Sequence, residues 1–196
     1  ESGIRSQLTF QEAAIPATPD QLLALLEELG MEPRTHRHEA VFTVEESRYV
    51  KEAIPGGHTK NLFVKDKKDN YFLIVAEGEA QIPMNRIHGL LGARSRLSFG
   101  NADRLMEYLG RAPGSVTAFA AINDHGGRVR VVLDEALLAW DHINCHPLTN
   151  TMTTTISREN LLRFLDHVGH PPLVLPLSRE GAEREGAEGD TMENEG

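Results

Sequence analysis

Apolar side chains recur at helical spacing in the first patterned stretch of the chain, where leucines stand three or four positions apart at Leu22, Leu25, Leu26 and Leu29. Thr18, Pro19 and Gln21 precede them and combine an N-cap hydroxyl, a proline at the first helical position and a glutamine that closes a capping box. Together these features predict a helix over 18–30. A second capping box, Thr43 with Glu46, predicts a shorter helix that reaches Ala53.

The pattern then changes to one typical of strands. Residues 60–65 and 71–76 are rich in aromatic and β-branched side chains, and the polar segment 66–70 separates them, which predicts a β-hairpin. Residues 116–122 and 129–133, on either side of a Gly-Gly turn, predict a second hairpin. A further strand is expected over the Thr-rich residues 152–156.

Three more helices are predicted, over 83–91, 101–109 and 157–168. Because helices and strands mix without a regular strand–helix–strand alternation, the pattern predicts an α+β fold, with a mixed sheet or small barrel flanked by helices. Residues 1–177 are expected to form one domain. The Glu- and Gly-rich segment 178–196 has almost no apolar content and is predicted to be a disordered acidic tail.

Charge is distributed unevenly along the chain. The net charge is −9, and seven acids against two arginines after position 177 contribute −5 of it, which leaves −4 for the body. An RNA ligand would therefore need a local basic patch. The single cysteine, Cys145, and the absence of a secretory leader favour a reducing, cytoplasmic setting, and no apolar run approaches the roughly 20 residues of a membrane span.

Several kinds of chemistry lack their sequence signatures. His36 with His38, and His142 with Cys145 and His146, are only partial metal-ligand sets, so no metal and no other cofactor is expected. No strand-to-helix Gly-x-Ser-x-Gly elbow, Walker loop or dinucleotide fingerprint occurs. Cys145 has no cysteine-hydrolase signature around it and is expected to be a small buried apolar residue.

Three unusual polar stretches remain, at 56–63, 113–117 and 146–151. In the first, two glycines precede a predicted strand that carries a Lys-Asn pair. The second is a Pro-Gly turn whose backbone amides suit an oxyanion or phosphate, and the third is a loop dense in hydrogen-bonding groups.

Taken in order, these stretches resemble the YbaK/ProX family of freestanding prolyl-tRNA editing proteins, which is related to the editing insertion domain of bacterial prolyl-tRNA synthetases. The similarity runs from about Phe10 to Pro171 and includes the 43–47 helix start and the His-Pro-x-x-Asn turn at 146–150. The branch that removes alanine from proline tRNA is the most similar, because it shares Ile15-Pro16-Ala17-Thr18 and the His-Pro-Leu-Thr-Asn turn.

The resemblance implies metal-free deacylation of mischarged tRNA, with the substrate's own 2′-hydroxyl assisting. The chemistry of the residues in these stretches suggests a catalytic set: Lys60 on the terminal phosphate, amides around Gly114 and Ser115 on the developing oxyanion, and His146. His146 acting as the general base is an alternative to the 2′-hydroxyl. The implied substrate-binding residues are Asn61, Thr117 and Asn150.

The implied partners are the acceptor end of a mischarged tRNA and a prolyl-tRNA synthetase. Two other functions stay open. A deacylase of Cys-tRNA(Pro) shares every motif and differs only in the shape of its pocket. Because Ala118 stands where the family usually has proline, a non-catalytic tRNA-binding or regulatory module with the same fold is the second alternative. Two further positions depart from the family pattern: Cys145 stands where the family commonly has an aromatic residue, and Met152 where it commonly has a small one. Both bear on which amino acid is removed.

Overall fold

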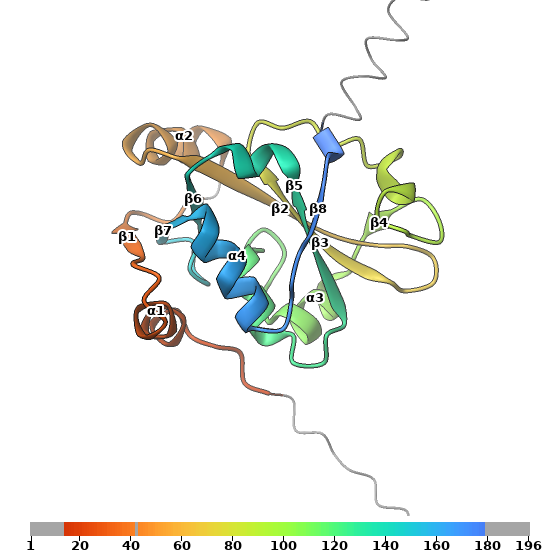
Figure 1. Ribbon diagram of the computed structural model, residues 1–196, viewed down its shortest axis with the longest axis horizontal. Coiled ribbons are helices and arrows are strands. Elements are labelled where there is room, and N and C mark those ends of the chain that lie inside the picture. Colours follow the sequence, from red (N-terminus) through yellow and green to blue (C-terminus); the bar gives the residue numbers. More distant parts are fainter. Residues whose placement is uncertain (1–13, 42, 179–196) are drawn as a thin grey trace, which may run out of the picture.

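A computed structural model describes residues 14–41 and 43–178, apart from the side chain of Val44. Figure 1 shows a twisted mixed sheet with helices around it. In chain order the elements are α1 (Pro19–Glu28), β1 (Arg34–Arg37), α2 (Val44–Ala53), β2 (Gly57–Lys65), β3 (Tyr71–Glu77), η1 (Ile87–Gly89), β4 (Ser98–Phe99), α3 (Ala102–Leu109), η2 (Ala118–Asn123), β5 (Val129–Asp134), η3 (Glu135–Ala139), β6 (His142–Cys145), β7 (Met152–Ser157), α4 (Arg158–His167) and β8 (Leu173–Leu175).

Within the described residues, eight strands form the sheet, in the order β1-β7-β6-β2-β3-β5-β8, with β4 beside β2. The predicted hairpin is confirmed, since β2 and β3 pair antiparallel from Thr59–Glu77 to Lys65–Tyr71. The carboxylate of Asp66 stabilises its turn by accepting hydrogen bonds from the backbone N–H groups of Lys68 and Asn70. The predicted α+β class, a mixed sheet flanked by helices, is confirmed.

The central strand β3 separates two apolar clusters. Its residues from Tyr71 to Ala76 are all buried, because both faces of the strand are covered. Leu73 and Val75 point into the larger cluster, with α1, α3, α4 and η2, while Phe72 and Ile74 point into a smaller cluster around Ile87 and Leu91. In Figure 1, α2 lies apart from α1, α3 and α4, beside the start of β2.

Both predicted capping boxes are present, with Gln21 donating its N–H to Thr18 Oγ1 and Glu46 donating to Thr43 Oγ1. The helices over 101–109 and 157–168 are also confirmed as α3 and α4. The predicted helix over 83–91 is wrong except for the short 3₁₀ segment η1, since turns occupy most of the rest.

The second predicted hairpin is wrong. Residues 118–123 form the 3₁₀ helix η2, in which Thr117 Oγ1 accepts the Phe119 N–H, and β5 instead pairs in parallel with β3. The cause is burial on all sides: Ala118, Phe119, Ala120 and Ala121 are nearly inaccessible, and a short apolar run of this kind does not distinguish strand from helix.

The predicted tail lies outside the described residues from position 179 onward. Ser178, at its start, donates its side-chain hydroxyl to the buried carboxylate of Asp134 (Oγ to Oδ2, 2.6 Å) and its N–H to the other oxygen (3.2 Å). Leu177 is fully buried. The boundary between domain and tail at 177/178 stays a prediction.

The start of β2 approaches β6 closely enough to require glycine. Gly56 has φ +117°, and a Cβ there would stand 2.9 Å from the His142 carbonyl oxygen and 3.0 Å from Asn144 Nδ2. At Gly57, a Cβ would meet Cγ of Trp140 at 2.6 Å. The two glycines therefore allow the parallel pairing of Gly57 with Ile143 and of His58 with Asn144.

We expect Gly56→Ala to lower the free energy of unfolding by about 3 kcal/mol, because it adds an overpacked contact to backbone strain. Gly127→Ala is the matched control: Gly127 also has positive φ (+61°), but among the described residues beyond its chain neighbours no heavy atom lies within 4 Å of the position that a Cβ would occupy. The control should lose only about 1 kcal/mol. Urea unfolding of the two variants measures the difference, and equal losses would show that the close approach is unimportant.

Candidate functional site

Four neighbouring strands present polar side chains on one face of the sheet. The registers place Arg34 opposite Thr155, His36 opposite Thr153, Asn144 opposite Thr155 and His58 opposite Asn144. Partners across a ladder share a face, as do residues two apart in a strand. We call this face the polar floor; it consists of Arg34, His36, His58, Lys60, His142, Asn144, Thr153 and Thr155.

A small cavity of about 190 Å³ opens over half of the polar floor, and α2 covers one side of it. We call it the Lys60 cavity. Its polar floor residues are His58, Lys60, Asn144 and Thr153, and the remaining lining residues are Val41, Ser47, Val50, Lys51, Thr59, Gly78, Cys145 and His146. Lys60 and His146, two residues expected at the site from the sequence, therefore lie in one cavity although they are far apart along the chain.

Asn144 connects the elements around this cavity. Its buried side chain donates from Nδ2 to the Pro55 carbonyl (3.1 Å) and accepts at Oδ1 from the Thr155 hydroxyl (2.5 Å). Its backbone carbonyl accepts from the Thr59 hydroxyl (2.9 Å). Since these partners belong to β2, β7 and the segment after α2, Asn144 fixes the relative positions of three cavity walls.

His146 is held as a neutral imidazole with a defined tautomer. Its Nδ1 lies 2.9 Å from the Met152 carbonyl, which can only accept, so Nδ1 carries the proton and Nε2 keeps its lone pair. Burial lowers the pKa of His146, as do the nearby His38, His58 and Arg111, and these effects exceed the opposing effect of the Met152 hydrogen bond. His146 is therefore a hydrogen-bond acceptor at neutral pH.

Two lysines line the cavity. The Lys60 ammonium donates to the Ala80 carbonyl in the segment after β3. Lys51, on α2, pairs with the exposed Glu79 (Nζ to Oε1, 3.2 Å). His58 Nε2 donates to the Ile54 carbonyl (2.8 Å), and burial, followed by the charge of Lys51, lowers the pKa of His58 despite this hydrogen bond. The cavity therefore combines two cations with two neutral imidazoles.

The Pro-Gly turn at 113–117, which we call the glycine loop, is tied to His146 through Thr117. The buried Thr117 hydroxyl donates to the His146 carbonyl (2.7 Å). Gly114 has φ +82°, while the Ser115 N–H donates to the Ala112 carbonyl (3.1 Å) within its own turn, and Arg111 Nε donates to the Ser115 carbonyl (3.0 Å). Neither Gly114 nor Ser115 is among the residues that line the Lys60 cavity.

Asn61 and Asn150 are likewise outside the cavity lining. Asn61 follows Lys60 in β2, so strand alternation directs it to the opposite face, where its Oδ1 is buried without a hydrogen-bond partner in the described chain. Sequence reasoning missed His58, Asn144, Thr153 and Lys51. His58 lies within the unusual Gly-Gly-His-Thr-Lys stretch, and Asn144 lies two positions before His146, so these two residues have a local signal in the sequence.

The Cys145 thiol lies in the cavity wall but is not prepared to act as a nucleophile. It is almost fully buried, and burial raises its pKa to about 12. The hydrogen bond from the Thr59 hydroxyl, 3.7 Å from Sγ, lowers the pKa, but by less than burial raises it. The thiolate is the reactive form, so a thiol with this pKa is inert near neutral pH.

Within residues 14–41 and 43–178, no three His, Cys, Asp or Glu side chains gather closely enough to hold a metal ion. The same part contains no helix with the length and apolar character needed to traverse a bilayer.

The family model of the aminoacyl-tRNA editing domain matches residues 38–164, more than half of the chain, from the residue after β1 to within α4. The chain therefore belongs to the aminoacyl-tRNA editing domain family. Its relatives include a prolyl-tRNA synthetase associated domain-containing protein of Bos taurus, 36% identical over 171 residues that cover 85% of this chain and 98% of the relative.

The prolyl-tRNA editing protein ProX of Acetoanaerobium sticklandii is 31% identical over 150 residues, which cover 76% of this chain and 91% of that protein. The resemblance to ProX-type prolyl-tRNA editing proteins is thus confirmed. A crystal structure described as a candidate trans-editing enzyme for prolyl-tRNA synthetase superposes with a TM-score of 0.63 at 19% identity, covering 83% of this chain and 98% of that one. At that identity the superposition establishes a shared fold alone.

We expect the pKa values of two histidines, the buried His170 and the partly buried His146, to depart in opposite directions from the ordinary value of 6.5. His170 Nε2 lies 2.8 Å from the buried Asp124 carboxylate, which raises the pKa of His170, whereas the pKa of His146 is lowered. Ring chemical shifts followed by NMR across pH 4–9 should therefore show His146 neutral at pH 6.5 and His170 protonated. A His146 midpoint above 6.5 would contradict the assigned neutral state.

These shifts have opposite consequences for stability. The raised pKa of His170 gives stability that is complete below pH 6.5 and is lost as pH rises through its folded value. Between 6.5 and the lower folded pKa of His146, the unfolded chain binds more protons, so stability falls as pH decreases through that window. Denaturant midpoints of His146→Gln and His170→Gln against pH separate the two contributions.

Proposed function

We propose that this chain hydrolyses the ester of mischarged Ala-tRNA(Pro) in trans. The observation that carries the proposal is the Lys60 cavity, which brings a lysine and a neutral histidine together in a small polar space within an editing domain. ProX, by its printed name a prolyl-tRNA editing protein, supports proline tRNA as the substrate.

Lys60 is assigned to the terminal phosphate of the tRNA. An ammonium group has three donors, and the Ala80 carbonyl uses one of them, so Lys60 can stay anchored while it contacts a phosphate oxygen. The body of the chain carries a net charge of −4, which makes local cations in the cavity important for attracting RNA.

His146 is assigned to the terminal ribose. With Nδ1–H donated to Met152, the Nε2 lone pair accepts a hydrogen bond from the 2′-hydroxyl and orients that hydroxyl toward the neighbouring ester. The substrate's own hydroxyl then assists the attack of water on the carbonyl carbon. This assignment needs neither an ionised cysteine nor a metal ion.

We assign to the glycine loop the stabilisation of the negative charge that develops on the carbonyl oxygen. A preorganised backbone donor at such a position is worth about 3–4 kcal/mol. The Ser115 N–H is engaged within its turn, whereas the amides of Gly114 and Val116 donate to no group in the described chain, so these two are the better donors. Thr117 positions the loop through the His146 carbonyl, and Asn61 and Asn150 are proposed to contact the substrate once it is bound.

Selectivity for alanine is assigned to size. A synthetase pocket made for proline cannot exclude a smaller amino acid by contact energy, since one methylene is worth about 1–3 kcal/mol. The Lys60 cavity has a volume of about 190 Å³. A second site that takes alanine but is too small for proline removes the error. We assign that second site to the Lys60 cavity, and a prolyl-tRNA synthetase is the proposed source of the substrate.

Lys60→Ala should lower kcat/KM for Ala-tRNA(Pro) about 100-fold, or about 2.7 kcal/mol of transition-state binding. Lys60→Arg should recover only part of the activity, because the guanidinium directs its donors differently. Lys65→Ala is the matched control. Lys65 lies on the same strand but pairs with Asp69 (2.6 Å), away from the cavity, and its removal should leave turnover unchanged.

Release of labelled alanine from purified Ala-tRNA(Pro) measures these rates, with Cys-tRNA(Pro) and Pro-tRNA(Pro) run in parallel. Wild-type turnover by a folded Lys60→Ala protein would remove Lys60 from the site. Faster release of cysteine than of alanine would reassign the substrate, and no release of either would show that the fold serves only to bind or regulate.

Incubation with a strong chelator should leave deacylation unchanged, because the described residues offer no group of three metal-binding side chains. The measurement is the deacylation rate of untreated and chelated protein, together with the metal content of the purified chain. Stoichiometric zinc, with activity lost on chelation and restored by metal, would refute the assigned mechanism.

A further inference from the structure

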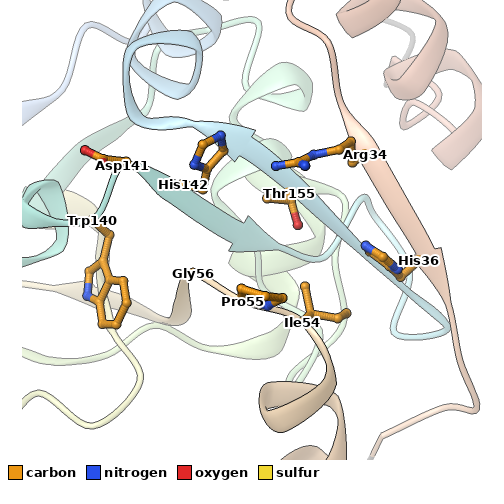
Figure 2. A pocket seen from close by; sticks show the side chains of 9 residues that line it. All are labelled: Arg34, His36, Ile54, Pro55, Gly56, Trp140, Asp141, His142 and Thr155. Carbon is orange, nitrogen blue, oxygen red and sulfur yellow. The ribbon is translucent and has the colours of Figure 1, made fainter.

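The other half of the polar floor lies in a second cavity, of about 440 Å³, which we call the Trp140 cavity. Figure 2 shows Arg34, Thr155 and His142 along one side of it, with Ile54 and Pro55 on the opposite side. His36, Gly56, Asp141 and Trp140 complete its lining.

The two cavities adjoin. Asn144 lines the Lys60 cavity, and its Nδ2 donates to the carbonyl of Pro55, which lines the Trp140 cavity. Its Oδ1 accepts from Thr155, another residue of the Trp140 cavity. The Asn144 side chain therefore forms a wall shared by the two cavities. If the reactive end of an extended ligand lies in the Lys60 cavity, the part of the ligand that follows it lies beside this wall.

Trp140 gives the second cavity an exposed aromatic surface. Trp140 is 43% exposed although its ring packs over Gly57, and it is the only tryptophan in the chain. Ile54 and Pro55 add apolar surface across from the polar floor. Flat apolar surface next to hydrogen-bonding groups suits a nucleobase, because base–aromatic stacking is worth about 1–3 kcal/mol.

Charge in the cavity favours a phosphate beside that base. The exposed Arg34 guanidinium has no hydrogen-bond or ion-pair partner within residues 14–41 and 43–178. Asp141, the acid in the cavity lining, lies 3.5 Å from the Arg158 guanidinium, and in Figure 2 its carboxylate points away from Arg34. Glu32 does not line the Trp140 cavity; it lines a neighbouring pocket, to which Arg34 also contributes. The unpaired cation at this edge of the cavity is therefore available to RNA.

We propose that the Trp140 cavity binds the single-stranded 3′ end of the tRNA. A nucleobase of that end stacks on Trp140, and Arg34 pairs with a phosphate of the same strand while the aminoacyl ester occupies the Lys60 cavity. The inference rests on the proposed function for the identity of the RNA. It adds a binding surface to the site and assigns it to β1, β6 and the residue that follows η3.

Binding of uncharged tRNA(Pro) tests the surface separately from hydrolysis. Trp140 fluorescence should change on addition of the intact transcript, and a transcript that lacks its single-stranded 3′ nucleotides should give little change. An equal response to both transcripts, or no response to either, would overturn the proposal. A response to the intact transcript supports it even if no aminoacyl group is ever released, so failure of the deacylase proposal is distinguishable.

Variants identify the contacts. Arg34→Gln should weaken binding about fivefold at low salt and reduce the slope of log affinity against log salt by about 0.7, the value for one phosphate on a single strand. Arg37→Gln is the matched control. Arg37 is exposed on the same strand, opposite Met152 in the β1–β7 ladder, but it stands three positions from Arg34, so its side chain points to the other face of the sheet. It should leave both quantities unchanged. Equal effects of the two variants would overturn the assignment.

Trp140→Ala should weaken binding at least about fivefold, measured by anisotropy of end-labelled tRNA, and Trp140→Phe should restore part of the loss because it keeps an aromatic face. The phenylalanine variant also keeps the test valid if the alanine variant unfolds. In deacylation assays, Arg34→Gln and Trp140→Phe should raise KM with kcat nearly unchanged, in contrast to Lys60→Ala. Normal KM values for both would refute the proposal.

Discussion

The parallel contact between β2 and β6 is the constraint on which the site depends. It consists of two residue pairs, Gly57 with Ile143 and His58 with Asn144, and it joins the two parts of the sheet. A one-residue slip in a strand exchanges its two faces, so a shift here would move His58 and Lys60 off the polar floor. The Asn144 amide opposes such a shift, because both its donor and its acceptor are buried and satisfied only in this register.

The sequence predicts those parts of the fold whose signals are local. Capping boxes at Thr18 and Thr43 mark α1 and α2, and the polar 66–70 turn marks the β2–β3 hairpin. The parallel pairings of β3 with β5 and of β2 with β6 have no local signal, since each depends on contacts between distant segments. The strand β6 was missed for the same reason: four residues with mixed polarity acquire their identity as a strand only from β2 and β7.

The site was predictable to a similar extent. Lys60 and His146 stand in stretches whose composition is unusual, and the fold brings both into one cavity. Asn61 looks equivalent to Lys60 in the sequence, yet strand alternation separates them. The contributions of Asn144 and Thr155 depend on long-range register. The roles of Gly114, Ser115, Thr117 and Asn150 stay predictions, because only Thr117 has a direct link, through the His146 carbonyl, to a cavity residue.

The burial of Cys145 has a consequence for the conditions that the protein tolerates. Oxidants such as peroxide attack thiolates, and the products range from reversible sulfenic acid to irreversible sulfonic acid. A thiol with a pKa of about 12, shielded in a cavity wall, offers almost no thiolate to such reagents. The chemistry proposed for the cavity uses an amine, an imidazole and backbone amides instead. A site of this design therefore keeps its shape and its reactive groups when the surroundings turn oxidising.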